Sequence, residues 1–290
     1  MFPAAFEYVA PSTLDQAIGL LATYGLDAKV LAGGQSLIPA MRFRLITPKV
    51  LVDINRLDGL NFLEESDGYL RVAALVRHRD VERSDLIRRR YPLLADTAAV
   101  VADPIVRHLG TLAGSVAHAD PAGDWGAALL AARAEVVIAS PRGRRIVPLD
   151  GFFTGPLVTV LQPDELVTEI RVPAPGAREA GAYLKIERKV GDFAVVAVGV
   201  QVAVGDAAVC RRAGIGLCAV GPTSLRAAEA EDWLVGKALD GAAISRAAEL
   251  AAAAASPADD TRGPAEYKRD MVRVLTARAL RRALERVQAA

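Results

Sequence analysis

The chain has 290 residues, of which 52% are hydrophobic and 24% charged, and its formal net charge is +1. A disordered chain would have fewer apolar residues and a larger net charge, so we expect one large domain or two to three small ones. The balanced charge excludes a general nucleic-acid binder. The longest apolar run, residues 193–204, is shorter than the roughly 20 residues of a transmembrane segment. The first residues lack the pattern of a secretory signal, so we expect a cytoplasmic protein.

The first 55 residues predict a compact β-α-β-α-β unit. Residues 13–24 carry apolar side chains at helical spacing and are followed by Gly25, a common residue after a helix end. Short strands are expected at residues 29–32 and 49–53, and a helical turn at residues 36–44.

Residues 56–175 predict a second unit that mixes strands and helices. The expected strands are residues 70–74, 135–139 and 166–172, and the expected helices are residues 79–84, 93–101 and 124–133. Pro173-Ala174-Pro175-Gly176 predicts a linker, because two prolines and a glycine interrupt both helix and sheet.

The remaining residues, 177–290, predict a C-terminal domain with an antiparallel three-stranded sheet and a helical bundle. The expected strands are residues 182–188, 194–204 and 214–220, and the expected helices are residues 224–235, 244–255 and 264–288. The predicted fold class is therefore α+β, with domains at 1–175 and 177–290 and a division of the first near residue 55.

A glycine pair is the first candidate binding element. Gly33-Gly34-Gln35-Ser36 follows a predicted strand and precedes a helical turn. Adjacent glycines allow backbone N–H groups to converge on one point, and a helix N-terminus adds partial positive charge, which suits a pyrophosphate. The spacing matches neither the Rossmann nor the P-loop motif, and a simple strand–helix turn is the alternative.

Two further segments are candidates for binding. Residues 110–121 combine small residues, hydroxyls, His118 and Asp120, so a ligand could lie close to their backbone, with Asp124 just beyond; His118 fits a packed loop histidine or a catalyst. Residues 185–194 place cations around a Gly-Asp-aromatic turn, which could hold an anionic ring edge or be solvated.

Metal chemistry is not predicted for this chain. The only two cysteines, Cys210 and Cys218, are too few for an iron–sulfur cluster, which takes about four thiolates, and are expected to be buried thiols. None of the three histidines belongs to an HExxH motif.

The candidate segments, taken in order, resemble those of one family. Ala-Gly-Gly-Gln-Ser-Leu (32–37), Gly-Thr-Leu-Ala-Gly-Ser (110–115) with Ala-His-Ala-Asp-Pro (117–121), and Arg-Lys-Val-Gly-Asp-Phe-Ala (188–194) are similar to the FAD-binding medium subunits of molybdenum hydroxylases. This family includes xanthine dehydrogenase and aerobic carbon monoxide dehydrogenase, and the resemblance is greatest to the latter type. Residues 221–223 and 260–268 are also similar to its C-terminal domain, so the resemblance covers the whole chain.

The resemblance implies a two-subdomain FAD-binding region of the PCMH type at 1–175, a C-terminal flavoprotein domain, and FAD bound without a covalent link. Residues 32–37 would enclose the pyrophosphate and residues 111–115 its other side, with the two aspartates anchoring polar groups, Lys185 near the polar edge of the isoalloxazine and Phe193 over part of the ring. The family usually has Gly-Gly-Asn where this chain has Ala-Gly-Ser at 113–115. The implied cofactor-binding residues are Ala32, Gly33, Gly34, Gln35, Ser36, Leu37, Thr111, Leu112, Ala113, Gly114, Ser115, Ala117, Asp120, Asp124, Lys185 and Phe193.

The implied function is electron transfer, with no catalytic acid, base or metal ligand in this chain. A large partner subunit would carry the molybdenum cofactor and a small one the [2Fe–2S] clusters, in a dimer of heterotrimers, either free in the cytoplasm or peripheral at the inner face of the membrane. FAD would pass the electrons to an external acceptor. Two alternatives are a stand-alone FAD-dependent oxidoreductase and a non-catalytic assembly protein that retains the fold.

Overall fold

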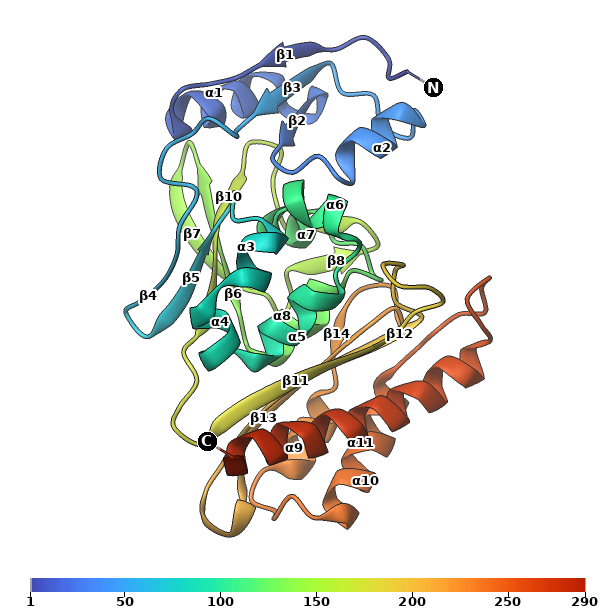
Figure 1. The fold of residues 1–290 in the computed structure, drawn as a ribbon. Helices are drawn as coiled ribbons and strands as arrows, with labels where there is room; N and C mark the ends of the chain where they lie inside the picture. Colours follow the sequence, from blue (N-terminus) through green and yellow to red (C-terminus); the bar gives the residue numbers. More distant parts are fainter. Residues whose placement is uncertain (1, 290) are drawn as a thin grey trace.

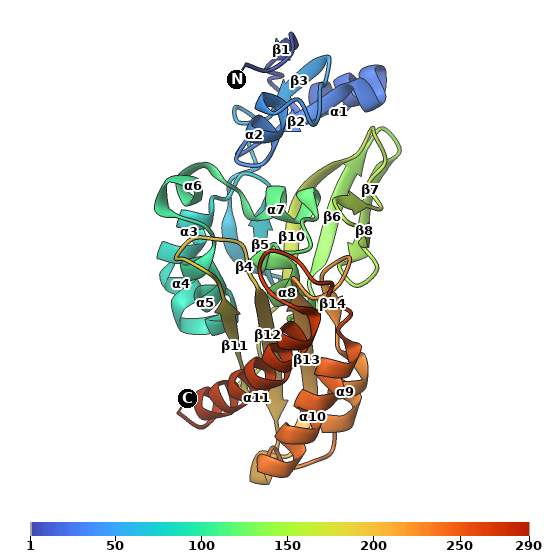
Figure 2. The ribbon, with the colours of Figure 1, turned by 90° about the vertical axis from the view of Figure 1, so that its right-hand side faces the viewer.

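A computed structural model describes residues 2–289 and shows three main sheets that follow one another along the molecule, each with its own helices (Figure 1 and Figure 2). Sheets and helices occur in every part of the chain, so the fold is α+β, as predicted.

The first sheet is parallel, with strand order β1-β3-β2, and its elements confirm the predicted β-α-β-α-β unit. Thr13 begins α1 by accepting a hydrogen bond from the Gln16 amide, and Gly25 ends it with a φ of +53°. Because β2 and β3 are parallel, the segments that follow them leave the sheet at the same edge. The elements are β1 (Glu7–Val9), α1 (Leu14–Tyr24), the 3₁₀ turn η1 (Gly25–Asp27), β2 (Ala28–Leu31), α2 (Leu37–Arg42) and β3 (Val50–Asp53).

The second sheet has five antiparallel strands in the order β4-β5-β10-β6-β7, with helices packed on it. Its strands are β4 (Leu63–Ser66), β5 (Tyr69–Ala73), β6 (Glu135–Ser140), β7 (Gly143–Pro148) and β10 (Leu166–Pro173), and β8 (Phe153–Gly155) pairs separately with β9 (Val158–Thr159). The helices are α3 (His78–Arg83), α4 (Asp85–Arg90), α5 (Pro92–Val100), α6 (Pro104–Leu109), α7 (Leu112–His118) and α8 (Asp124–Ala131).

Several of these elements were not predicted. β7 is an edge strand whose Arg144 and Arg145 face solvent, so it lacks the apolar pattern of a buried strand. Residues 112–118 were expected as part of a loop but form α7, because the Thr111 hydroxyl accepts a hydrogen bond from the Gly114 amide and caps the helix.

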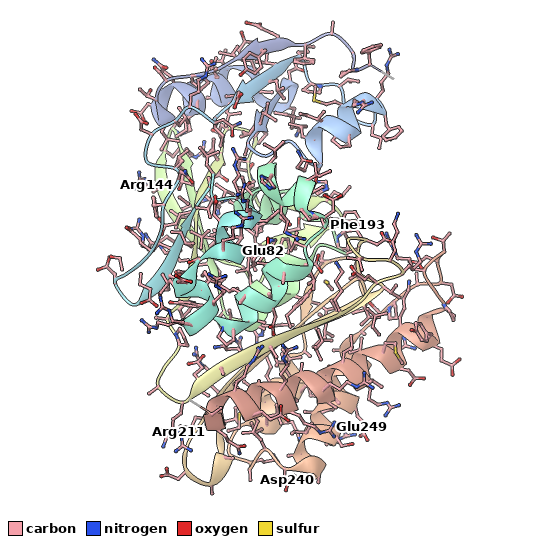
Figure 3. The ribbon with its side chains drawn as sticks, in the orientation of Figure 1. Glu82, Arg144, Phe193, Arg211, Asp240 and Glu249 are labelled. Atoms are coloured by element: carbon pink, nitrogen blue, oxygen red, sulfur yellow. The ribbon has the colours of Figure 1, made fainter. Side chains whose placement is uncertain are left out.

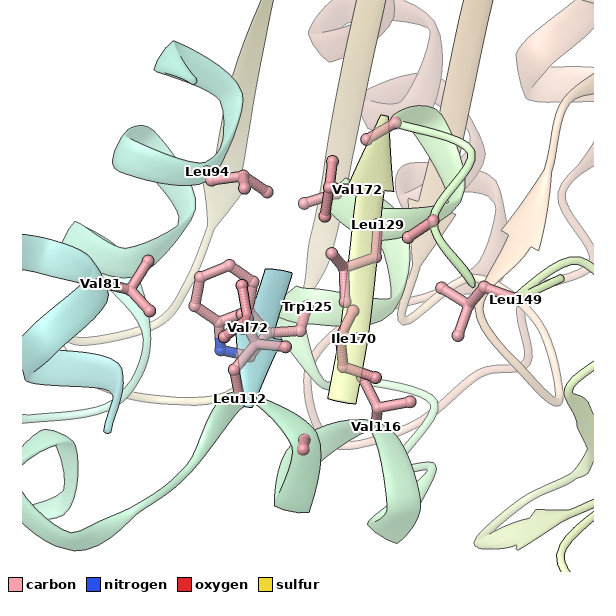
Figure 4. Close-up of a cluster of buried hydrophobic side chains, with 14 of the residues drawn as sticks. Val72, Val81, Leu94, Leu112, Val116, Trp125, Leu129, Leu149, Ile170 and Val172 are labelled. Atoms are coloured by element: carbon pink, nitrogen blue, oxygen red, sulfur yellow. The ribbon is translucent and has the colours of Figure 1, made fainter. Parts of the chain in front are cut away.

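The core beneath this sheet surrounds Trp125, which is fully buried on α8 among Val72, Val81 and Leu112 (Figure 4). The side chains come from a strand and from three different helices. The core therefore holds α7 and α8, whose N-terminal ends carry candidate site residues, against the sheet.

The third sheet is antiparallel and has four strands, where three were predicted. The additional strand, β14, falls at the start of a segment expected to be helical, and its two residues pair with Gly216 and Leu217 of β13. Helix α11 packs on β11 and β12, and α10 packs on α11. The elements are β11 (Glu179–Ile186), β12 (Val196–Val204), the 3₁₀ turn η2 (Asp206–Ala208), β13 (Cys210–Cys218), β14 (Leu225–Arg226), α9 (Ala228–Leu234), α10 (Gly241–Ala254) and α11 (Ala265–Ala289).

The other face of the third sheet is covered by α5 and α8 of the preceding region. Helix α8 approaches very closely, because a Cβ on Gly214 or Gly216 would lie 1.9 Å from the Ala131 carbonyl oxygen or 2.0 Å from that of Ala127. Glycine is thus required at both strand positions, and this contact places Asp124, at the start of α8, beside the sheet. No helix within residues 2–289 is long and apolar enough to cross a membrane.

Candidate functional site

The glycine pair lies in the connection from β2 to α2, at the edge of the first sheet. Gly34 has a φ of +71°, which favours glycine, and the Gln35 side chain donates through Nε2 to the Gly33 carbonyl oxygen at 3.3 Å. The Ser36 side chain precedes α2 but makes no capping hydrogen bond, so its hydroxyl is available to a ligand.

The structure brings this glycine turn into direct contact with the second candidate segment. A Cβ on Gly33 would lie 2.4 Å from the Leu109 carbonyl oxygen and 2.7 Å from the Gly110 Cα. Two stretches almost 80 positions apart in the sequence therefore touch backbone to backbone, and only glycine at position 33 permits this approach.

A polar network that the sequence analysis did not identify hydrogen-bonds to both segments of this contact. Asn55 donates to the carbonyl oxygen of Ala32 at 2.9 Å and to Asp53 at 2.6 Å. The Arg77 guanidinium donates to Asn55 Oδ1 at 2.6 Å and to the Leu109 carbonyl oxygen. Arg77 thereby joins the edge of the first sheet to the second segment. Asp53 ends the parallel strand β3 and Asn55 follows it, a position where polar residues often line a site, and this signal could have revealed them.

Charge in this network is controlled by burial and hydrogen bonding. Burial lowers the pKa of the Arg77 guanidinium, with Asp80 and Asp53 opposing the effect. Burial by itself would raise the pKa of Asp53, but hydrogen bonds from Tyr8 at 2.6 Å and from Asn55 outweigh it and hold that pKa below its usual value.

His78 fills the space on the other side of Gly110. A Cβ on Gly110 would lie 2.8 Å from the His78 ring, and the His78 amide donates to the Gly110 carbonyl oxygen at 2.9 Å. Trp125 Nε1 donates to His78 Nδ1 at 3.0 Å, and the two rings are stacked. Burial, with a smaller contribution from Arg107 and Arg77, lowers the pKa of His78 to about 4.

The second group of predicted residues lies at the beginning and along one side of α7. The side chains of Thr111, Leu112 and Ala113 are buried, so these residues can offer a ligand only backbone groups, whereas Gly114 is exposed and Ser115 half-buried. Asp120 accepts a hydrogen bond from the Ala122 amide at 2.9 Å. The remaining member, Ala117, is half-buried on α7.

Asp124 and Lys185 lie together as a buried ion pair. Lys185 Nζ is 3.1 Å from Asp124 Oδ2 and donates to the Val100 carbonyl oxygen, at the end of α5, at 3.0 Å. Tyr183 donates to the other oxygen of Asp124 at 2.8 Å. Burial raises the pKa of Asp124 to about 6, although Lys185 and Tyr183 oppose that rise. The pair joins β11 to α5 and to α8, the two helices on this face of the sheet.

Phe193 lies apart from this ion pair, on the segment between β11 and β12, and it is 46% exposed (Figure 3). The neighbouring Gly191 packs against the backbone of residues 102–103, and the Arg262 guanidinium lies 5.8 Å from the centre of the Phe193 ring. The segment that carries Phe193 therefore packs against the residues that follow α5.

Together these residues form a continuous strip suited to a long dinucleotide. The glycine turn contacts Gly110, α7 follows, and the Ser115 hydroxyl lies near Gly123, directly before the ion pair of Asp124. Two buried polar atoms at the far end, Glu187 Oε2 and Arg262 Nε, have no hydrogen-bond partner among the described residues. Both atoms are enclosed by protein, so the fit to FAD rests on the other end of the strip, where the glycine turn and the exposed Gly114 present no bulky side chain to a pyrophosphate.

A cavity lies beside this strip, at Asn55 and Arg77. It has a volume of about 450 Å³ and is lined by residues that include Asn55, Phe62, Leu75, Arg77 and Asp80. None of the predicted cofactor-binding residues lines it, so we attach no cofactor role to this cavity. Across residues 2–289, no three His, Cys, Asp or Glu side chains are arranged to hold a metal ion.

Comparison with known proteins assigns both halves of the chain. The family described as the FAD binding domain in molybdopterin dehydrogenase matches residues 4–175, and the CO dehydrogenase flavoprotein C-terminal domain matches residues 181–283. The carbon monoxide dehydrogenase medium chain of Hydrogenophaga pseudoflava is 41% identical over 99% of both chains.

Solved structures agree with these matches. A reconstituted CO dehydrogenase from Oligotropha carboxidovorans has a chain with a TM-score of 0.96 and 38% identity, covering 99% of this chain and 100% of that one. Quinoline 2-oxidoreductase from Pseudomonas putida 86 has a chain with a TM-score of 0.91 and 33% identity, covering 99% of each.

Proposed function

This chain belongs to the family of FAD-binding flavoprotein subunits of molybdenum hydroxylases, and from that premise we propose that it binds one FAD without a covalent link and transfers electrons through it. The observation that carries this proposal is the backbone contact between the glycine turn at Gly33 and the second segment at Leu109–Gly110. It creates one strip of small residues from two distant parts of the chain.

The residues of the strip hold and orient the cofactor. Backbone N–H groups of residues 33–37 and of Thr111 and Ala113 are suited to the pyrophosphate, and the Ser36 and Ser115 hydroxyls can donate to it. Phe193, at the far end, is suited to cover part of the flavin ring. Asp124 and Lys185 act there mainly through their charges, since their polar atoms already pair with each other and with neighbouring groups.

FAD, when bound, supplies the capacity to accept electrons and pass them to an external acceptor. We assign the molybdenum cofactor and the [2Fe–2S] clusters to a large and a small partner subunit, because the two cysteines of this chain are buried in β13. The same reasoning assigns substrate specificity to the molybdenum subunit. We also propose that the complex is cytoplasmic, which cell fractionation would test.

Exposed apolar side chains support a lasting contact with another chain. They lie on α2, on the segment that follows α2, and on α6, close to the Gly33–Leu109 contact. These side chains are Ile38, Phe43, Leu45, Ile105 and Leu109. We call this set the α2–α6 patch. Isolated proteins rarely expose such clusters unless a partner covers them, and we propose a dimer of heterotrimers.

The proposal is tested by FAD binding to the full-length chain and to a Gly33→Ala variant. The bound flavin should give the purified chain an absorption band at about 450 nm, and acid precipitation should release the yellow colour into the supernatant. Gly33→Ala should lose most of its FAD, since the added methyl group forces the two segments apart, and overpacking of this kind typically costs about 1–3 kcal/mol.

Gly19→Ala is the matched control, because Gly19 lies within α1 and has no neighbouring atom within 4 Å of an added Cβ. This variant should keep full FAD occupancy. A chain without FAD, a yellow pellet after acid, or full occupancy in Gly33→Ala would each contradict the proposed binding mode.

A further inference from the structure

The two segments that meet at Gly33 touch without a hydrogen bond between them. A Cβ on Gly33 would lie 2.4 Å from the Leu109 carbonyl oxygen, so the backbones are in contact. Within residues 2–289, however, no hydrogen bond joins residues 32–37 directly to residues 109–115. Van der Waals attraction between the segments does little to fix their relative orientation, because it lacks the directionality of a hydrogen bond.

A bridge of two polar side chains, Arg77 and Asn55, supplies a directional link. The Arg77 guanidinium donates to the Leu109 carbonyl oxygen through Nη1 and to Asn55 Oδ1 through Nη2, the latter at 2.6 Å. Asn55 Nδ2 donates in turn to the Ala32 carbonyl oxygen at 2.9 Å. The bridge thus runs from the residue directly before Gly33 to the residue that Gly33 contacts.

Both ends of this bridge are anchored. The Arg77 amide donates to the Asp80 carboxylate at 3.1 Å, and Arg77 pairs with Thr111 in an isolated antiparallel β-bridge, which ties its backbone to the second segment. Asp53 Oδ1 accepts from the Asn55 amide at 2.9 Å and from Asn55 Nδ2 at 2.6 Å. These contacts turn Nδ2 toward the first sheet and leave Oδ1 as the acceptor for the guanidinium.

Arg77 lines the cavity of about 450 Å³ beside the proposed FAD strip. None of the predicted cofactor-binding residues lines this cavity. Arg77 can therefore act on the cofactor through the two segments that it connects.

We propose that Arg77 and Asn55 are positioning residues that hold the two pyrophosphate-binding segments in alignment before FAD binds. This inference rests on the proposed function and adds two residues that act through the carbonyl oxygens of Ala32 and Leu109. An aligned site binds more tightly, because the apparent dissociation constant equals the intrinsic one divided by the fraction of molecules in the competent arrangement. Without the bridge this fraction falls, and FAD must bring the segments together itself.

The test is the FAD dissociation constant of the full-length protein, stripped of flavin and titrated by calorimetry. Arg77→Met and Asn55→Ala should each raise Kd about fivefold or more. Asn55→Ala keeps the positive charge of Arg77, so its effect separates the bridge from a simple attraction between arginine and phosphate. The double variant should bind FAD about as weakly as the weaker-binding single variant, because each substitution breaks the same bridge.

A fragment of the cofactor locates the effect. ADP carries the pyrophosphate but no flavin ring, so its Kd should rise by a factor similar to that for FAD in both single variants.

Arg56→Met and Asn61→Ala are the matched controls. Both side chains line the same cavity and are exposed, and neither has a hydrogen-bond partner within residues 2–289. Both substitutions should leave the Kd for FAD unchanged.

A wild-type Kd in Asn55→Ala overturns the inference, also where Arg77→Met fails to fold. So does a double variant whose rise in Kd equals the product of the two single rises, since the residues would then act independently. Unchanged ADP affinity in the single variants overturns it as well, because the effect would then lie at the flavin ring. A wild-type protein that binds no FAD would refute the proposed function, and this inference with it.

Discussion

His78 shows how a single buried side chain can position the site. The Trp125 indole N–H can only donate, so His78 Nδ1 must accept, and the proton of the neutral imidazole is on Nε2. This neutral ring packs against Gly110, which in turn packs against Gly33. A charged imidazolium would lose the hydrogen bond from Trp125, so the protonation state of His78 matters for the alignment of both segments.

The low pKa of His78 predicts a specific loss of stability in acid. Between pH 6.5 and about 4 the unfolded chain binds a proton that folded His78 does not, so the free energy of unfolding falls as the pH falls. The contribution is about 3 kcal/mol across this window. Asp124 acts in the opposite direction, since its pKa is raised from 3.8 to about 6 and the folded chain protonates first.

A His78→Gln variant separates the two effects, because glutamine can still accept from Trp125 but does not titrate. Relative to wild type, its free energy of unfolding should rise by about 3 kcal/mol between pH 6.5 and 4, as measured by urea denaturation. Gly19→Ala, which changes no titratable group and adds a methyl group with no neighbouring atom within 4 Å, should follow the wild-type pH dependence. Equal pH dependence of His78→Gln and wild type would mean that His78 is not held neutral.

At the scale of elements, one carboxylate connects the last helix to the region that holds the site. Asp96 on α5 accepts from Arg286 on α11 through both oxygens, at 2.7 and 2.8 Å, and from the Tyr183 amide of β11 at 3.2 Å. Arg286 also donates to the Gly181 carbonyl oxygen at 2.6 Å. The position of α5 therefore depends on its contacts with β11 and α11. The Val100 carbonyl oxygen at the end of this helix accepts the hydrogen bond from Lys185.

Asp96→Ala should lower the free energy of unfolding by about 2–4 kcal/mol, because it leaves the mostly buried Arg286 without its counter-charge. Glu249→Ala is the control, since Glu249, labelled in Figure 3, forms an exposed pair with Arg246 on α10 and pairs with neither Asp96 nor Arg286. The control should cost about 0.5 kcal/mol or less in the same urea titration. Similar losses in both variants would show that Asp96 contributes no more than a surface charge.

At the scale of the whole molecule, the exposed apolar side chains set an expectation about assembly. Co-expressed with its partners, the chain should copurify with two other subunits at a mass that fits two copies of each, as measured by size exclusion with light scattering. Alone, it should be prone to aggregation and should oxidise no substrate. Obligate interfaces bury on the order of 2,000 Å² or more of mostly apolar surface. A few central residues contribute most of the binding energy, so one polar substitution among them weakens the complex.

Leu45→Ser, in the α2–α6 patch, should reduce copurification while FAD binding is retained. Ile146→Ser removes an exposed apolar side chain of β7 instead and should leave the complex intact. A monomer that steadily reduces a dye with candidate substrates would favour the stand-alone oxidoreductase. Undiminished copurification of Leu45→Ser would remove the patch from the interface.

The sequence by itself determined the elements and segments whose signals are local. Helical spacing with Thr13 and Gly25 predicted α1, and Gly33-Gly34 after a strand predicted the turn between β2 and α2. The order of the candidate segments identified the family that the comparisons confirmed. These signals depend on residues within a few positions of one another, so they can be detected in the sequence without knowledge of tertiary contacts.

Only the tertiary structure decided which distant residues act together. It turned Thr111 into the cap of α7, paired Asp124 with Lys185, and joined Gly33 to Gly110 through a contact that no periodicity encodes. It also revealed β14 and the role of Arg77, which donates to Asn55 after β3 and to the Leu109 carbonyl oxygen on α6. The physical reason is that burial and hydrogen-bond satisfaction are settled between segments far apart in sequence, where each residue's role depends on what packs against it.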